Sequence, residues 1–500
     1  MVLIFSLMDR TLIFAADGLY NKQNSNQKKV YRYRKWEEYG YLDYVTYADY
    51  LLELTKNGEI TEETRSQAVA IGRTPDKDSA IVKKYAAQFK EYYESQGYEV
   101  VRMDAVVSGN KLVTGGQEQY FAYKDKPLIG RLLNYLGSVI TIDNIHKAPD
   151  IEGKRGLIFT WHDPVYGGEK FSPAIMGNGT THRYLLYFDS KFPYLHQNLI
   201  TISLGTSFVV NSGVDVFTTM TQSQGSYVLE DTYYPTGHVE KSADDLHTAV
   251  NIPGSLANSA LNQQRFTDDY TSTIARKNGS SKMGYSFSIG IIATLLSYML
   301  GIPIGIIMAR HKDKLFDKIG TIYIIFIIAV PSLAYIFLFK AIGSKVLGLP
   351  STFNVQNPTW LMYILPVVSL SLPSVAGLMR WLRRFMIDQM NSDYVKFARS
   401  GGLSESEIFS KHILKNAIIP IVHGIPGAIL GAMVGAIITE RVYVVPGTGN
   451  MLTTAINTYD NNVIVGMAMF FAVLSVTSLI LGDLFMSMVD PRISFSSKAR

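Results

Sequence analysis

The segment from Asp393 to Ile408 has residue types and a spacing that predict a binding surface. Tyr394, Phe397 and Ala398 recur at positions i, i+3 and i+4, so a two-turn helix places them on one apolar face. The burial of such an apolar face away from water lowers the free energy. The pattern therefore predicts an interaction, in which this face docks against another surface.

The residues that follow predict a sharp corner after this helix. Gly401 and Gly402 can end the helix in a left-handed turn. Ser404 and Glu407 have the spacing of a capping box, which predicts the start of a second helix. A corner that projects an apolar knob fits two uses equally well. It can dock into a groove on another protein, or it can rest on the lipid interface.

The sequence excludes several kinds of chemistry. It has no G-x-x-x-x-G-K-S/T phosphate loop, no G-x-S-x-G elbow and no cysteine. Its nine histidines show no H-E-x-x-H spacing, and we interpret His162 and His182 as polar residues of loops or strands. The net charge of +5 comes without an arginine–lysine tract. We therefore expect no catalytic residue, no metal, no cofactor and no nucleic-acid partner.

The elements around the corner have the composition of membrane spans, which begin after Met283. A helix needs roughly 20 apolar residues to cross a bilayer. Neighbouring helices let such spans tolerate the glycines and prolines seen here. The alternative is a set of buried helices in a large soluble core. Five segments qualify as spans: Phe287–Ala309, Ile322–Phe339, Trp360–Leu378, Ala417–Thr439 and Val463–Phe485.

Basic residues alternate between the loops. They cluster after the first, third and fifth predicted spans, whereas the loop 341–359 holds only Lys345 and the loop 440–462 holds only Arg441. Basic loops face the cytoplasm. We therefore expect an α-helical polytopic protein of the cell membrane, with the loop 391–416 and the C-terminus in the cytoplasm. Residues 281–500 form its membrane core, and residues 15–280 lie outside the cell.

The apolar stub Met1–Met8 is too short to span a bilayer. It also lacks the basic region and the cleavage site of a signal peptide. We interpret residues 1–14 as the outer end of a first span whose beginning is missing, so that six spans are expected. The alternative is a stub that lies on the membrane surface.

Residues 15–280 predict a large inserted α+β domain. Tyr31–Lys56 and Asp76–Tyr93 have helical spacing, whereas Tyr184–Phe188 and Ile200–Leu204 alternate like strands. The sequence leaves open whether this domain binds a ligand itself, seats a partner protein or does both.

The corner resembles the EAA loop of ABC importer permeases, in the version found in dipeptide and oligopeptide permeases. The matching residues are Asp393-Tyr394-Val395, Ala398-Arg399-Ser400, Gly402-Leu403-Ser404, His412, Leu414, Asn416-Ala417 and Pro420. Lys396-Phe397-Ala398 stands where the general pattern has Glu-Ala-Ala, a departure that fits the peptide branch. The resemblance implies an ATPase-coupling role for Asp393, Tyr394, Phe397, Ala398, Arg399, Gly401, Gly402, Leu403, Ser404, Glu407 and Ile408.

A second stretch resembles the outer loop before the last span of the same permeases. It runs from Glu440 through Pro446, Gly447 and Gly449, which we assign to an outer gate loop. The resemblance implies a type I permease fold of the streptococcal kind, with an enlarged loop between the first two spans. It also implies a second homologous permease, two ABC ATPase subunits, a lipid-anchored extracellular peptide-binding protein and an oligopeptide substrate.

Two functions of other classes compete with this interpretation. An ion-coupled transporter or channel usually has ionisable groups near mid-membrane. The predicted spans hold only His423 and Asp483 near their ends, where structural or snorkelling roles are favoured. A membrane-anchored sensor or adhesin would explain the outer domain but not five spans with a docking corner.

Overall fold

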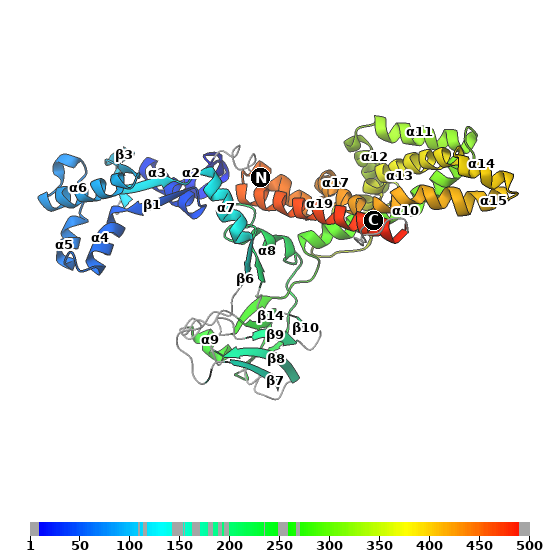
Figure 1. The fold of residues 1–500 in the computed structure, drawn as a ribbon. Coiled ribbons are helices and arrows are strands. Elements are labelled where there is room, and N and C mark those ends of the chain that lie inside the picture. Colours follow the sequence, from blue (N-terminus) through cyan, green and yellow to red (C-terminus); the bar gives the residue numbers. More distant parts are fainter. Residues whose placement is uncertain are drawn as a thin grey trace, which may run out of the picture. The chain divides into compact units, whose positions relative to one another are not determined.

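The computed structural model describes residues 10–108, 111–113, 118–142, 154, 156–162, 171–178, 184–188, 193–194, 200–234, 236–248, 259–266 and 271–489. Figure 1 shows the ribbon coloured along the sequence. Contacts within the chain divide it into two compact units. The first comprises residues 1–139, 207–212 and 455–465, and the second comprises residues 140–206, 213–454 and 466–500. These units do not follow the predicted boundary at residue 281, because the segment 15–280 contributes to both.

A three-stranded antiparallel sheet forms the centre of the first unit, in the order β1 (Leu42–Thr46), β5 (Tyr120–Asp125) and β2 (Glu99–Arg102). Successive side chains of a strand point to opposite faces. Phe121 accordingly packs in the core beneath α3 (Ser25–Glu38), whereas Tyr120 and Ala122 pack against α4 (Tyr47–Lys56) and α6 (Ala80–Ser95). Helices therefore cover both faces of the sheet.

The other described elements of the first unit are short. They are η1 (Leu12–Ala16), α2 (Gly18–Asn21), α5 (Glu62–Ala68), η2 (Pro75–Lys77), the β3–β4 hairpin (Val106–Ser108 and Lys111–Val113) and α7 (Leu128–Val139).

Residues 10–14 correct the prediction of a span end at 1–14. Ile13 and Phe14 are buried in the same core cluster as Trp36, and the Trp36 indole N–H donates to the Arg10 carbonyl at 3.0 Å. Both apolar side chains thus serve the core of the first unit instead of meeting lipid. Met1–Met8 lies outside the described residues, so the upstream span and the count of six stay predictions.

The prediction of continuous helical structure over Tyr31–Lys56 is wrong, because β1 interrupts it. Gly40 has φ +72°, which turns the chain after α3, and the side chains of β1 are alternately buried and half-buried. Thr46 then forms a capping box with Asp49 that opens α4. The sequence pattern did not distinguish this strand, because the tyrosines and charged residues around it also fit the period of a helix.

Long helices dominate the second unit: α10 (Lys282–Arg310), α11 (Leu315–Ala329), α12 (Ser332–Lys345), α13 (Leu361–Met390), α14 (Asp393–Ser400), α15 (Glu405–Glu407), η5 (Ile408–Leu414), α16 (Lys415–His423), α17 (Ile425–Tyr443), α18 (Thr448–Asn457) and α19 (Asn461–Val489). Within the described residues, α10, α13, α17 and α19 are each long and apolar enough to cross a membrane. The count becomes five if α11 and α12 together form one span.

The predicted span Ile322–Phe339 contains a break, because α11 and α12 meet at a bend of 109°. Proline disfavours helical backbone in the residue before it. Val330, which precedes Pro331, is extended with ψ 129°, and α11 ends at Ala329. The predicted span Ala417–Thr439 is also divided, since Gly424 separates α16 from α17.

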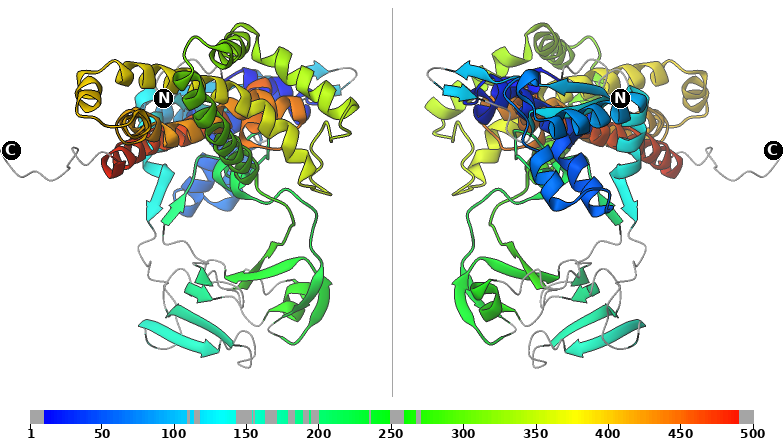
Figure 2. Two further views of the ribbon diagram at one scale, coloured as in Figure 1. Left: turned by 90° about the vertical axis from the view of Figure 1, so that its right-hand side faces the viewer. Right: turned by 90° about the vertical axis from the view of Figure 1, so that its left-hand side faces the viewer.

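Helices α10 and α13 pack side by side, and the helices of this unit are coloured from green to red in Figure 2. Small residues allow the close approach. A Cβ added at Gly301 would lie 2.8 Å from the Leu378 Cβ, and one at Gly305 would lie 3.3 Å from the Leu382 Cβ. The Ser297 hydroxyl donates across the interface to the Ser371 carbonyl at 3.2 Å. This pair forms the central helix contact of the second unit.

The second unit also contains strands and short helices. A four-stranded antiparallel sheet has the order β10 (Pro193–Tyr194), β9 (Tyr184–Phe188), β8 (Phe171–Asn178) and β7 (Gly156–His162). Three two-stranded sheets pair β6 (Ile140–Ile142) with β11 (Ile200–Ile202), β12 (Glu230–Tyr233) with β13 (Val239–Ser242), and β14 (Asp244–Thr248) with β15 (Thr271–Ala275). The helices are α8 (Val216–Thr221) and α9 (Ala260–Arg265). The strand predicted at Tyr184–Phe188 is confirmed, and of the strand predicted at Ile200–Leu204 the first three residues are confirmed as β11.

Asp460 organises a turn within the first unit. Its carboxylate is buried and accepts the backbone N–H groups of residues 208–210 at 2.8–3.0 Å, and the Ser207 hydroxyl donates to it at 2.8 Å. Four donors on one carboxylate oxygen fix the segment 207–210 to the turn between α18 and α19. Both segments belong to the first unit, although most of their neighbours in sequence belong to the second.

We expect Asp460→Ala to release this turn. Buried amides that lose their acceptor cost about 1–3 kcal/mol each, so amide hydrogen exchange at residues 208–210 should accelerate by about tenfold or more. Hydrogen-exchange mass spectrometry on the purified protein measures this. The matched control is Asp388→Ala, because that aspartate is exposed and makes only a 4.0 Å ion pair. Equal exchange in both variants would contradict the assigned role.

Candidate functional site

The predicted corner forms from residue 393 to residue 408. Helix α14 ends at Ser400, Gly402 has φ +83°, and Ser404 and Glu407 make the reciprocal capping box that opens α15. The left-handed φ at Gly402 favours glycine over any residue with a side chain. The predictions of the helix, the turn and the cap are confirmed.

The two faces of α14 have opposite environments. Val395 is buried and Ala398 is only 8% exposed, packed with Leu382, Met386 and Ile413. These contacts fix the underside of α14 to α13 and to the helical segment that follows the corner.

Phe397, in contrast, is 80% exposed, and Tyr394 and Leu403 are 37% and 39% exposed. The exposed apolar surface of the corner is therefore made by Tyr394, Phe397 and Leu403. The prediction that Ala398 belongs to it is wrong, because Ala398 lies on the buried side with Val395. Sequence reasoning missed Val395, although its i, i+3 spacing to Ala398 already carried the signal.

Polar contacts hold the corner in shape. The Arg399 guanidinium donates two hydrogen bonds to Glu405, at 2.6 and 3.1 Å, and lowers the pKa of that carboxyl. The hydrogen bond from Lys396 lowers the pKa of Asp393, and the hydrogen bonds from Ser404 lower the pKa of Glu407. These groups are exposed, so each pair stabilises the fold only weakly. Their effect is on geometry, since Arg399 and Glu405 lie on opposite sides of the turn.

Tyr394 connects the two arms of the corner. Its hydroxyl donates to the Gln389 side chain at 2.6 Å and accepts from the Asn416 amide at 3.1 Å. Asn416 is 22 residues away in sequence and belongs to the Asn416-Ala417 part of the motif. The spacing of the motif therefore has a structural reason, which sequence reasoning did not identify.

A buried carboxylate organises the loop predicted as an outer gate. The Glu440 side chain is inaccessible to solvent, accepts the Ser286 hydroxyl at 2.6 Å and accepts the Asn450 backbone N–H at 2.9 Å. Ser286 in turn accepts the Thr448 backbone N–H at 2.8 Å. The chain thus wraps around one carboxylate, which explains why a charged group can be buried here.

The glycines of this loop leave no room for a side chain. A Cβ added at Gly447 would overlap the Glu440 carboxyl, and one at Gly449 would lie 2.7 Å from the Ile437 Cα. Of the four predicted residues, Glu440, Gly447 and Gly449 come together. Pro446 lies in the same loop but makes no hydrogen bond to Glu440, as its missing N–H requires. Sequence reasoning missed Ser286, since no local pattern connects residues 154 positions apart.

A hollow of about 350 Å³ lies between α12, α13 and α17. The described residues of its lining combine hydroxyl groups with small and apolar side chains, and none of them is charged. The lining residues are Ser332, Tyr335, Ile336, Ser369, Leu370, Pro373, Ser374, Ala428, Gly431, Ala432, Ile438 and Thr439. An uncharged, hydroxyl-lined hollow suits neutral polar groups such as peptide amides.

Comparison with known proteins identifies the family. The family described as "Binding-protein-dependent transport system inner membrane component" matches residues 301–495. The oligopeptide transport system permease protein AmiC of Streptococcus pneumoniae is 32% identical, over 99% of this chain and 94% of AmiC. This chain belongs to the ABC-transporter permease family that includes AmiC.

More distant relatives agree with this membership. The dipeptide transport system permease protein DppB of Lactococcus lactis is 30% identical, over 43% of this chain and 70% of DppB. A solved amino acid ABC transporter matches with TM-score 0.34 and 17% identity, over 41% of this chain and 92% of its own. That structural likeness is too weak to support an argument.

Membership of the permease family confirms the resemblance found in the sequence and the helical permease fold. It makes the chain a multi-pass membrane transport subunit and not an enzyme, and it decides against the sensor or adhesin. His423 and Asp483 do pair, at 3.2 Å between Nε2 and Oδ1, and we interpret the pair as a contact between α16 and α19.

We expect Gly447→Ala to displace Glu440 and disrupt the loop of this permease. The added methyl group would overlap the carboxyl, and burying a carboxylate without its partners is costly. The thermal midpoint of the purified protein in detergent should therefore fall by several degrees.

The control is Gly377→Ala in α13, because an added Cβ there meets nothing within 4 Å and alanine favours a helix. That variant should keep or raise the midpoint. A midpoint for Gly447→Ala equal to that of the unaltered protein would show that the loop does not depend on this close contact.

Proposed function

We propose that this permease moves oligopeptides into the cell as one membrane subunit of an ATP-driven importer. The observation that carries the proposal is the similarity to AmiC, an oligopeptide transport system permease protein, over 99% of this chain. The sequence has no phosphate loop of its own, so the energy must come from partner subunits. The proposed assembly contains a second homologous permease, two ABC ATPase subunits and a lipid-anchored extracellular peptide-binding protein.

The corner at residues 393–408, within the loop 391–416, is the proposed ATPase-coupling element. A docking surface needs an exposed apolar anchor on a rigid support. Phe397 supplies the anchor, and the packing of Val395 and Ala398 supplies the support. This combination favours docking into a groove over rest on lipid. The proposed coupling residues are Asp393, Tyr394, Phe397, Ala398, Arg399, Gly401, Gly402, Leu403, Ser404, Glu407 and Ile408.

The hollow between α12, α13 and α17 is proposed as part of the peptide path. Its serine and threonine hydroxyls can bond to peptide groups, which are the same in every peptide. The absence of charge from its lining fits a path that accepts peptides of varied sequence. The loop around Glu440 is proposed to act as the outer gate of this path.

The experiment that tests the function is reconstitution. Co-expression with candidate neighbouring ATPases and a second permease should give a complex that hydrolyses ATP. In proteoliposomes with the peptide-binding protein, this complex should take up labelled oligopeptide without an ion gradient. A complex that hydrolyses ATP but takes up no peptide would refute the substrate, and uptake that needs an ion gradient would refute the energy source.

For coupling, we expect Phe397→Ala to lower ATPase co-purification and peptide uptake by about tenfold or more, because a central apolar anchor contributes about 2 kcal/mol or more. Gly402→Pro should have the same effect, since proline cannot adopt a positive φ. Lys396→Ala is the control, because Lys396 makes only an exposed pair with Asp393. Normal uptake by both Phe397→Ala and Gly402→Pro at matched membrane levels would reject the coupling role.

We also propose that the loop 391–416 and the C-terminus are cytoplasmic and that residues 15–280 are extracellular. The chain has no cysteine, so single cysteines report topology cleanly. Cysteine at Lys345 should react with an impermeant reagent in intact cells, and cysteine at Lys314 should not. The bend at Pro331 makes this comparison decisive. Protection at both sites would mean that α11 and α12 form a re-entrant pair, and labelling at Lys314 would reverse the topology.

A further inference from the structure

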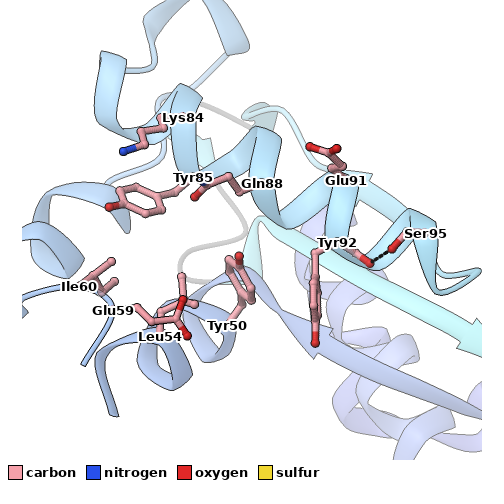
Figure 3. Close-up of a pocket in the computed structure, with 10 residues that line it drawn as sticks. All are labelled: Tyr50, Leu54, Glu59, Ile60, Lys84, Tyr85, Gln88, Glu91, Tyr92 and Ser95. Carbon is pink, nitrogen blue, oxygen red and sulfur yellow. Dashed lines mark hydrogen bonds between the residues drawn. The ribbon is translucent and has the colours of Figure 1, made fainter. Parts of the chain in front are cut away.

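The first unit contains a cleft that is not part of the proposed peptide path. It has a volume of about 570 Å³ and lies between α4 and α6 (Figure 3). Pockets for small ligands have volumes of roughly 300–1,000 Å³, whereas stable contacts between folded proteins use broad surfaces. The size of the cleft therefore favours a short segment over a folded partner. The lining residues are Tyr50, Leu54, Glu59, Ile60, Lys84, Tyr85, Gln88, Glu91, Tyr92 and Ser95.

The aromatic and polar groups of the cleft are available to a ligand. Tyr50, Tyr85 and Tyr92 line it, and Figure 3 shows their rings between the two helices. Among the described residues, none of these three hydroxyls makes a hydrogen bond with another side chain or with the backbone. Tyrosine offers an apolar ring and a hydroxyl together, which suits a ligand with both amide and aliphatic groups.

Opposite charges lie at two points along α6. Lys84 and Glu91 both line the cleft and are seven residues apart, which is about 10 Å along a helix. Neither makes an ion pair with another described residue. An extended tripeptide is also about 10 Å long, and it carries an ammonium group at one end and a carboxylate at the other. The separation of the two charges matches the separation of the two termini.

The remaining carboxylate sets a preference between peptides. Glu59 lies on the wall opposite α6 and likewise makes no ion pair with a described residue. The cleft thus holds two carboxylates and one ammonium group. Its excess negative charge favours a basic side chain on the ligand over an acidic one.

We infer that this cleft is a second peptide-binding site, which takes a free peptide of about three residues along α6. The carboxylate terminus of the peptide lies at Lys84, its ammonium terminus lies at Glu91, and its side chains meet the tyrosines. The inference rests on the proposed function in one respect, since it takes the transported class of molecule as the ligand. It differs in location, because the site lies in the first unit and not in the hollow between α12, α13 and α17.

The test measures binding to the full chain in lipid nanodiscs by isothermal titration calorimetry. Trialanine should bind, and N-acetyl-trialanine amide should bind at least tenfold more weakly, because both charged termini are lost. Ala-Lys-Ala should bind more tightly than Ala-Glu-Ala. Equal affinity for the free and the blocked tripeptide would overturn the inference.

Variants locate the site on α6. Lys84→Met and Glu91→Gln should each weaken trialanine binding by about tenfold. Their controls are Lys83→Met and Glu94→Gln, which change the same charges on the same helix outside the lining of the cleft. Equal effects in the variants and their controls would overturn the assignment. Binding of the purified peptide-binding protein to the cleft, without binding of tripeptide, would also overturn it.

The outcome is separable from the proposed function. If the reconstituted importer takes up peptides but the nanodisc protein shows no binding that depends on Lys84 and Glu91, only the second site is wrong. If such binding occurs but the importer takes up no peptide, the site stands and the proposed transport fails.

Discussion

The close contact of α10 with α13 is the constraint on which the rest of the second unit depends. Gly301 and Gly305 bring the α10 backbone against Leu378 and Leu382, and a side chain at Gly301 would force the helices apart. Interfaces of this kind are typical of membrane helices, where small residues gain van der Waals contact without a hydrophobic driving force. Near its start, α10 presents Ser286 to the loop around Glu440, and beyond the contact α13 carries the packing surface of the corner. Both elements for which a function is proposed are therefore positioned by one helix pair.

Buried carboxyl groups fix further contacts between the long helices. Asp317 in the first turn of α11 is buried and forms a two-point ion pair with Arg383 of α13, at 2.5 and 2.7 Å. Glu440 makes no direct ion pair with another described residue, and hydroxyl and backbone donors satisfy its carboxyl group. Removing Arg383 would leave the buried charge of Asp317 unpaired, which costs several kcal/mol. Removing Ser286 would leave the buried Glu440 carboxyl short of one hydrogen-bond donor. These groups hold elements in fixed geometry, which separates them from the mid-membrane ionisable groups that ion-coupled transporters use.

Local patterns in the sequence predicted local structure well. The apolar period located α10, α13 and α19, and the Gly402 and Ser404 signals defined the corner. The failures have specific physical causes. Pro331 is compatible with either a kinked or a broken span, and only the extended Val330 decides for the break. The partner of Glu440 comes from a helix far away in sequence, so no spacing could reveal it. Buried and exposed faces of α14 could not be told apart, because both are apolar and only the position of α13 distinguishes them.

The same helix gives the proposed coupling a physical route. The C-terminal half of α13 packs against the corner through Leu382 and Met386. The same helix lines the hollow with Ser369, Leu370, Pro373 and Ser374. Leu382 and Ser369 are 13 positions apart, which is about 20 Å along the axis. In the proposed coupling, a displacement of the corner by a docked ATPase would be transmitted by a packed helix and would need no chain of flexible loops. Pro373 lies between the two ends, and a proline inside a helix is where bending is least costly. A force applied at Phe397 would thus bend α13 at Pro373 and change the shape of the hollow there.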